Sequence, residues 1–151
     1  MSDFTDGRPP FGRLIDLYGV KIYVAGPLAD TKNVQAVQSA VVAAGHELTL
    51  DWSRGPDVTF EDDYGSLPAV SAMLATEDLD AVLRADAVLV VASEHDGRGM
   101  FVELGAALAR ARHGDLEHVV VIGPIRHESV FYYHPAVRRV SAVDEWLASL
   151  V

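Results

Sequence analysis

Two acidic residues stand in helical patterns where a carboxylate could act on a substrate. Glu103 lies near the start of a predicted helix that runs from about Gly99 to Arg112, in which apolar residues recur at helical spacing. Because a helix N-terminus carries a partial positive charge, we expect Glu103 to stay ionised, as a nucleophile or a base requires. The simpler alternative is that Glu103 only complements the helix dipole.

Asp78 lies in another predicted helix, from Pro68 to about Ala85. Acidic residues in such a run most often form a solvated face. This helix is expected to run antiparallel to the strands, so its earlier turns lie toward their carboxyl ends, and Asp78 could share a crevice with Glu103. Two close carboxylates can cleave a glycosidic bond with retention, one attacking the anomeric carbon while the other handles protons. Tyr23 could hold one carboxylate in place, although by itself it fits a packed strand aromatic.

The elements that must position these residues alternate between strand and helix patterns. Alternation predicts a parallel sheet with right-handed crossovers and helices on both faces. We expect a flavodoxin-like (Rossmann-like, doubly wound) α/β fold with five strands in the order 2-1-3-4-5 and a switch point between strands one and three. The predicted strands are 20–25, 46–50, 87–92, 118–122 and 137–140, and the predicted helices are 30–44, 68–85, 99–112 and 141–150.

Two features near the C-terminus complete this prediction. The segment 125–135 contains an aromatic cluster but no clean period, so we predict a loop there. Ser141, followed three residues later by Asp144, predicts a cap on the final helix.

The switch point brings two turns to opposite walls of one crevice. One turn follows the first strand at Gly26 and Pro27, and the other runs from Ser93 to Gly99. Both are predicted to contact the substrate, because ligands of open α/β sheets bind beyond the carboxyl ends of the strands.

The turn Asp96-Gly97-Arg98-Gly99 matches no standard phosphate motif. It lacks the Gly-Lys-Ser/Thr of a phosphate loop, and it is too short for the dinucleotide fingerprint. A tight strand-to-helix turn explains Gly97 and Gly99. Arg98 could meet an anion or be an ordinary surface charge.

Composition excludes several classes of function. With 12 Lys and Arg against 22 Asp and Glu, the net charge of -10 argues against a nucleic-acid partner and an anionic membrane surface. The absence of cysteine excludes disulfides and thiolate zinc sites, and the scattered histidines predict no metal site. We expect a cytoplasmic protein without a membrane span. Residues 1–18 are predicted to form a polar arm before a single domain, 19–151.

Three segments together resemble the nucleoside 2-deoxyribosyltransferase superfamily, which also contains nucleoside 5'-monophosphate N-glycosidases. They are KIYVAGPL at 21–28, EDLDAVLRADAVLVV at 77–91 and GRGMFVELGAALA at 97–109. The resemblance implies that Glu103 is the nucleophile at C1', that Asp78 assists proton transfer at the base, and that Tyr23 hydrogen-bonds to the nucleophile. It also implies a similar fold, a homo-oligomer whose neighbouring subunits complete the active site, and chemistry without a metal or organic cofactor.

The leading hypothesis is a transferase that moves the sugar of a 2'-deoxynucleoside to a free nucleobase. Trp52 is a candidate platform for the base and Asp51 a candidate contact to base or sugar, against plain packing and a loop cap. The nearest alternative is a nucleotide N-hydrolase whose 5'-phosphate meets Ser93, Arg98 and the amides of 97–99. A non-catalytic sensor of nucleosides or nucleotides is the alternative from another class.

Overall fold

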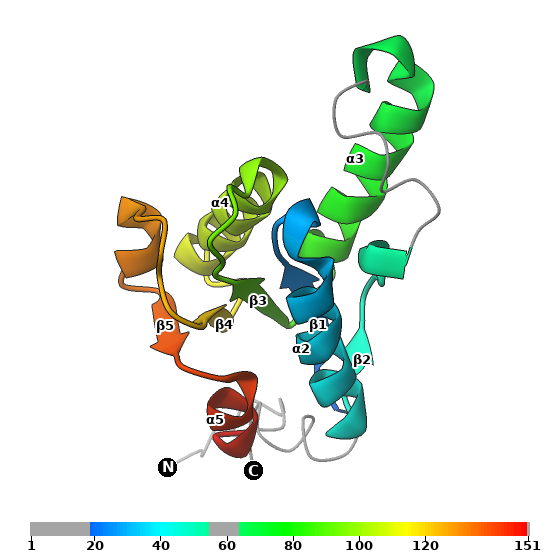
Figure 1. Ribbon diagram of the computed structural model, residues 1–151. Helices are drawn as coiled ribbons and strands as arrows, with labels where there is room; N and C mark the ends of the chain where they lie inside the picture. Colours follow the sequence, from blue (N-terminus) through cyan, green and yellow to red (C-terminus); the bar gives the residue numbers. More distant parts are fainter. Residues whose placement is uncertain (1–18, 55–63, 151) are drawn as a thin grey trace, which may run out of the picture.

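Five parallel strands form the centre of the protein, in the order β2-β1-β3-β4-β5 (Figure 1). The computed structural model describes residues 19–54 and 64–150. The observed strand order confirms the predicted order 2-1-3-4-5. The strands are β1 (Lys21–Ala25), β2 (Glu47–Leu48), β3 (Ala87–Val91), β4 (His118–Ile122) and β5 (Val137–Val140), and the α-helices are α2 (Thr31–Ala43), α3 (Pro68–Leu83), α4 (Arg98–Arg112) and α5 (Val143–Ala148).

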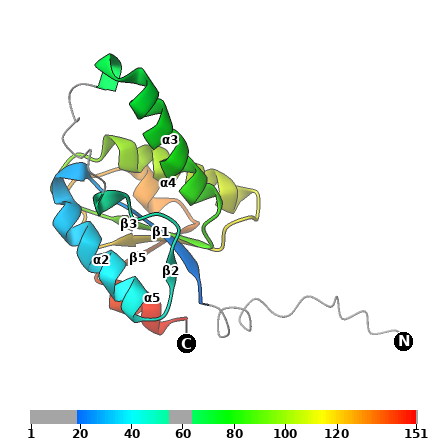
Figure 2. The ribbon, with the colours of Figure 1, turned by 90° about the vertical axis from the view of Figure 1, so that its right-hand side faces the viewer.

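The helices form two layers, one on each face of the sheet. Figure 2 shows α3 and α4 on one side of the strands and α2 and α5 on the other. Strand β3 is buried along its whole length, as expected for a central parallel strand. Because side chains alternate along a strand, Tyr23 packs in the core beneath α3 and α4, whereas Ile22 and Val24 pack beneath α2 and α5.

Strand β2 is shorter than predicted. Its ladder to β1 contains the bonds from the Glu47 amide to the Val20 carbonyl and from the Thr49 amide to the Ile22 carbonyl. The next carbonyl of β1 on this side belongs to Val24, and it accepts from the indole Nε1 of Trp52 at 2.7 Å. A side chain thus replaces the next backbone donor, and the chain turns into a short 3-10 helix at Trp52–Arg54.

Two local predictions near the C-terminus are wrong. The predicted loop 125–135 contains a 3-10 helix at Val130–Tyr133, which begins where the Ser129 hydroxyl accepts from the Phe131 amide. Helix α5 begins at Val143 and has no side-chain cap. Ser141 does not cap it, because Ala142 occupies the N-cap position, and the Ser141 amide donates to the Glu145 carboxylate at 3.1 Å.

The helices differ in how completely they are covered. Gly45 and Gly114 adopt positive φ just after α2 and α4, as is typical of glycines that end helices. Val42 in α2 is 54% exposed. In α3 the buried residues are Ala81 and Val82, and the first turns of the helix extend beyond α4 in both views (Figures 1 and 2).

Some predictions lie outside the described residues. The arm 1–18 is one of them, and the division of the chain into an arm and a single domain stays a prediction. Within residues 19–54 and 64–150, no helix is both long and apolar enough to cross a membrane. The same residues contain no group of three or more His, Asp or Glu side chains that could hold a metal ion.

Candidate active site

Tyr23 and Glu103 form the centre of the candidate site. Tyr23 lies in the middle of β1, opposite Val88 of β3, and its side chain is fully buried. Its hydroxyl donates a short hydrogen bond to Oε2 of Glu103 on α4. Strand β1 and helix α4 therefore join a phenol and a carboxyl that are 80 residues apart in the sequence.

The expectation that the helix N-terminus keeps Glu103 ionised is wrong. Helix α4 begins at Arg98, so Glu103 is its sixth residue, and its first turn contains no acidic residue. The helix dipole acts mainly within that first turn. Burial instead favours the uncharged acid and raises the pKa of Glu103 to about 8. The hydrogen bond from Tyr23 lowers this pKa, whereas the negative charge of Asp78 raises it further.

Asp78 on α3 interacts electrostatically with both of these groups. Burial, and then the charge of Glu77, raise the pKa of Asp78 to about 6. Asp78 is half-buried, whereas its neighbours Glu77 and Asp80 are exposed. Asp78 is therefore not part of a fully solvated face of the helix.

Tyr23 is held as a proton donor. Burial raises the pKa of its phenol far above the ordinary range, and the charge of Glu103 and its hydrogen bond add to this shift. The charge of Asp78 contributes in the same direction. The arrangement thus combines a neutral donor with two carboxyl groups of different pKa in partly buried surroundings.

Two of the glycines in these turns, Gly26 and Gly97, allow close packing. Gly26 and Pro27 are buried after β1, and a Cβ at Gly26 would collide with the Val34 side chain, so glycine allows α2 to pack closely there. Gly97 precedes α4, and a Cβ at this position would press against the Met100 side chain. A Cβ at Gly99 would meet open space.

Ser93 lines a hollow at the carboxyl edge of the sheet. Its hydroxyl accepts from the His95 amide at 3.1 Å. Arg98 and the glycines 97 and 99 do not line this hollow, whereas Arg126, which sequence reasoning missed, does. The position of Arg126 just after the Gly-Pro pair that ends β4 is the signal that could have identified it. The hollow has a volume of about 200 Å³ and is lined by Asp30, Asn33, Ala92, Ser93, Glu94, Pro124 and Arg126.

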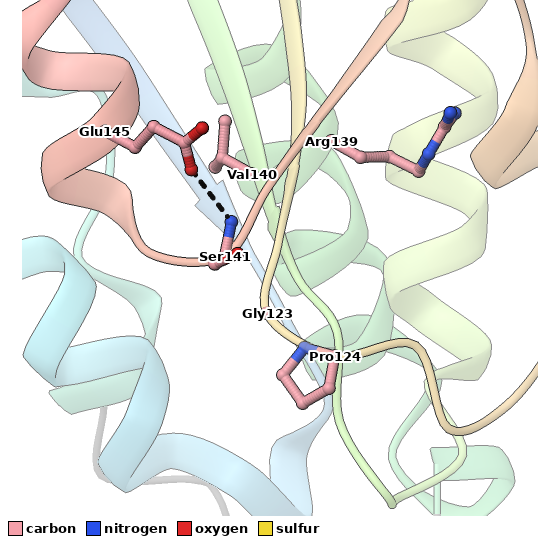
Figure 3. A pocket seen from close by; sticks show the side chains of 6 residues that line it. All are labelled: Gly123, Pro124, Arg139, Val140, Ser141 and Glu145. Atoms are coloured by element: carbon pink, nitrogen blue, oxygen red, sulfur yellow. Dashed lines mark hydrogen bonds between the residues drawn. The ribbon is translucent and has the colours of Figure 1, made fainter.

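A second hollow lies beyond the ends of β4 and β5 (Figure 3). Its volume is about 320 Å³, and its lining contains none of the predicted site residues. The Glu145 carboxylate accepts the Ser141 amide on one side, while the Arg139 side chain extends away from it (Figure 3). The guanidinium of Arg139 stacks 4.7 Å from the centre of the Tyr133 ring, so it already has a partner.

Asp51 and Trp52 both have partners within the chain. The Asp51 carboxylate accepts from the Ser53 hydroxyl at 2.9 Å and pairs with Nε of Arg54 at 2.9 Å. The indole of Trp52 is fixed to β1, and its half-buried ring contacts both layers of the core. The packing roles considered for these residues are thus present, and a contact with substrate stays a prediction.

Comparison with known proteins finds solved structures of similar fold. No protein-family model and no curated protein sequence matches the chain. A conserved protein from Enterococcus faecalis V583 superposes with a TM-score of 0.63 at 19% identity, over 87% of this chain and 96% of its own. A 2-deoxyribosyltransferase from Bacillus psychrosaccharolyticus superposes with a TM-score of 0.60 at 19% identity, over 86% and 95%.

A third solved structure, the CMP N-glycosidase BcmB of Clostridium botulinum, superposes less closely. Its TM-score is 0.50 at 13% identity, over 86% of this chain and 97% of its own. At such identities the likeness establishes the fold. The chain therefore has the fold of a 2-deoxyribosyltransferase and of a CMP N-glycosidase, which is consistent with its resemblance to the nucleoside 2-deoxyribosyltransferase superfamily.

Proposed function

We propose that this protein is an enzyme that cleaves the N-glycosidic bond of 2'-deoxynucleosides and transfers the sugar to another base. The observation that carries the proposal is the buried hydrogen bond from Tyr23 to Glu103, with the charge of Asp78 acting on both groups. A carboxyl pair of this kind fits displacement at an anomeric carbon through a covalent intermediate.

The proposed reaction begins with one proton shared by the two carboxyl groups. Glu103 attacks C1' as a carboxylate, the C1'–N bond breaks, and the proton held by Asp78 passes to the departing base. Tyr23 donates to one oxygen of Glu103 and leaves the other for attack, and this bond favours the ionised carboxylate.

The second half of the reaction regenerates the enzyme. A nitrogen of the incoming base attacks C1', the ester bond to Glu103 breaks, and the proton of that nitrogen returns to Asp78. In a hydrolase, water takes the place of the incoming base. No metal or organic cofactor enters the proposed steps.

The hydrolysis of nucleoside 5'-monophosphates is the second candidate. Ser93 and Arg126 line one hollow at the carboxyl edge, where a hydroxyl and a guanidinium could meet a phosphate. Arg98 and the 97–99 amides, which the sequence predicts for this role, lie outside the lining. Asp30 and Glu94 share the hollow and oppose an anion, so we place the transferase first.

Product analysis separates these candidates. The protein is incubated with deoxynucleosides or their 5'-monophosphates, with and without a second free base, and the products are followed by chromatography. Base exchange supports the transferase, and free sugar without exchange supports the hydrolase. If the folded protein turns over none of these substrates, the result supports the non-catalytic sensor. Tyr23, Asp78 and Glu103 together disfavour a sensor, because a sensor has no need of three interacting groups.

The nucleophile is tested by trapping. A 2'-fluorinated deoxynucleoside slows breakdown of a glycosyl ester, so intact-mass spectrometry should detect one added sugar, and peptide mapping should place it on Glu103. Glu103→Ala should remove both the adduct and the activity. Glu117→Gln, an exposed position before β4 at the opposite edge of the sheet, is the matched control and should keep both. Full activity of Glu103→Ala would refute the assignment.

We also propose a homo-oligomer. Leu79 and Leu83 are one turn apart on α3 and are 40% and 51% exposed, which leaves an apolar strip on a helix that carries a site residue. A second copy of this chain is the partner that the superfamily resemblance implies. The cytoplasmic setting stays a prediction.

A further inference from the structure

Arg110 on α4 holds the end of the neighbouring helix α3. Its Nη1 donates to the carbonyl oxygens of Val82 at 2.7 Å and Ala85 at 2.8 Å, and its Nη2 donates to the carbonyl of Asp115 at 3.0 Å. Val82 is in the last turn of α3, and Ala85 lies two residues after Leu83, where the helix ends. In residues 19–54 and 64–150, Arg110 forms no ion pair with a carboxylate.

The chemistry of a helix end explains why arginine suits this position. The last carbonyls of a helix have no partner within the helix and carry partial negative charge. A planar guanidinium can donate to several such oxygens at once, and its charge complements the helix C-terminus. The Arg110 side chain, which belongs to the neighbouring helix, therefore caps the C-terminal end of α3.

This contact lies on the same faces of the two helices as the candidate site. Arg110 follows Glu103 by seven residues on α4, which is about two turns, and Val82 follows Asp78 by four residues on α3, which is about one turn. Both helices run from the carboxyl edge of the sheet toward its amino edge, because α3 ends just before β3 and α4 begins just after it. Arg110 and Val82 therefore connect the same helix pair that carries Glu103 and Asp78.

The residues that α3 buries completely lie close to the Arg110 contact. They are Ala81 and Val82, both of them small. A slip of one residue along the helix axis would move Asp78 by about 1.5 Å, which is large for a catalytic group.

We propose that Arg110 is a positioning residue. Its hydrogen bonds to the carbonyls at the C-terminal end of α3 set the distance between the Asp78 and Glu103 carboxyl groups. Its importance for catalysis rests on the proposed function, but its control of Asp78 does not. The test therefore needs one measurement on the resting protein and one on turnover.

The first measurement is the titration of Glu103 by carbon-13 NMR, with Glu103→Gln identifying the signal. Arg110→Met removes the donors and keeps much of the stem. We expect the pKa of Glu103 to fall from about 8 toward the value measured in Asp78→Asn, because the charge of Asp78 moves away. In the double variant Asp78→Asn with Arg110→Met, no further fall is expected. Arg112→Met, which changes an exposed arginine of the same helix, should leave the pKa unchanged.

The second measurement is steady-state kinetics. Arg110→Met should lower kcat at least tenfold and change KM less than twofold, since the substrate contacts remain in place. Arg110→Lys keeps the charge and can restore part of the contact, so its Glu103 pKa and kcat should lie between those of the wild type and Arg110→Met.

The outcomes are distinct. A Glu103 pKa equal to that of the wild type in a folded Arg110→Met protein would overturn the inference, whatever the change in melting temperature. If Arg110→Met does not fold, Arg110→Lys decides: a lowered Glu103 pKa supports the inference and an unchanged one overturns it. Absence of turnover in the wild type refutes the proposed function alone, because the NMR titration still tests the position of Asp78.

Discussion

Asp78 on α3 acts on the ionisation of Glu103 on α4. Burial is the largest cause that raises the pKa of Glu103 to about 8, and the negative charge of Asp78 is the second cause that raises it. Asp78 itself has a pKa of about 6. Two interacting carboxyl groups titrate as a pair, and this pair holds one proton between these two values. The proposed reaction requires the singly protonated pair with its proton on Asp78, which is the less populated arrangement because Glu103 has the higher pKa.

The pH dependence of kcat/KM should therefore be bell-shaped. Below about pH 6 both carboxyl groups are protonated and Glu103 cannot attack, and above about pH 8 Asp78 has no proton to give. Initial rates at low substrate concentration from pH 5 to 9 give the profile. A rate that stays constant over this range would contradict a role for the pair.

Tyr23→Phe should shift this profile and reduce activity. The phenol hydrogen bond lowers the pKa of Glu103, so its loss raises that pKa and moves the alkaline limb to higher pH. We expect kcat to fall by about 10- to 100-fold, because less of the pair has Glu103 ionised. Tyr132→Phe is the control, since the Tyr132 ring is also buried but its hydroxyl has no hydrogen-bond partner in the described chain. An equal loss in both variants would argue for packing alone.

Glu103→Gln should stabilise the protein at alkaline pH. Between pH 4.5 and about 8 the folded protein retains a proton that the unfolded chain has released, so the free energy of unfolding of the wild type falls as pH rises. Glutamine has no proton to lose and avoids this penalty. Chemical denaturation at pH 8.5 should favour Glu103→Gln by roughly 2 to 4 kcal/mol, with the difference disappearing near pH 4. Glu117→Gln should show no such pH-dependent gain.

Trp52→Phe should destabilise the fold while keeping an aromatic ring. The variant loses the 2.7 Å bond to the Val24 carbonyl, at a cost of about 1 to 2 kcal/mol in the free energy of unfolding. Trp146→Phe is a useful comparison, because Trp146 is buried but its indole nitrogen has no hydrogen-bond partner in the described chain. A larger KM for Trp52→Ala than for Trp52→Phe, measured on folded protein, is expected if the base stacks on this ring.

The double variant Leu79→Glu with Leu83→Glu should shift the oligomer toward smaller species. Two carboxylates on the exposed strip of α3 cannot be buried against another copy without a large desolvation cost. Sedimentation velocity at several concentrations measures the change. Val42→Glu, at a 54% exposed position of α2, is the control and should keep the assembly of the wild type. Identical sedimentation of all three proteins would exclude this face of α3.

The strand order could be predicted because it follows from the chain pattern, whereas the hydrogen bond from Tyr23 to Glu103 was expected only from the resemblance to the nucleoside 2-deoxyribosyltransferase superfamily. Buried strands are continuous apolar runs, and the sheet topology brings the ends of β1 and β3 together. The ionisation of Glu103 could not be predicted in the same way. It depends on which groups bury the carboxyl, and burial is the largest cause of its raised pKa.

Contacts between side chains and distant backbone atoms could not be predicted from the sequence either. Any arginine on a helix surface looks the same in a sequence, and Arg110 is distinguished only by the carbonyls of α3 that lie within its reach. The shortness of β2 could not be predicted for the same reason. No local pattern in the sequence indicates that the Trp52 indole donates to the Val24 carbonyl in place of a backbone amide.

That indole has a consequence for the behaviour of the protein at high concentration. Strand β2 pairs with only two residues of β1, so the second half of β1 would otherwise present an open sheet edge. Open edges recruit strands from other molecules and start aggregation. By occupying the Val24 carbonyl and covering this edge with an aromatic ring, Trp52 closes the sheet to foreign strands.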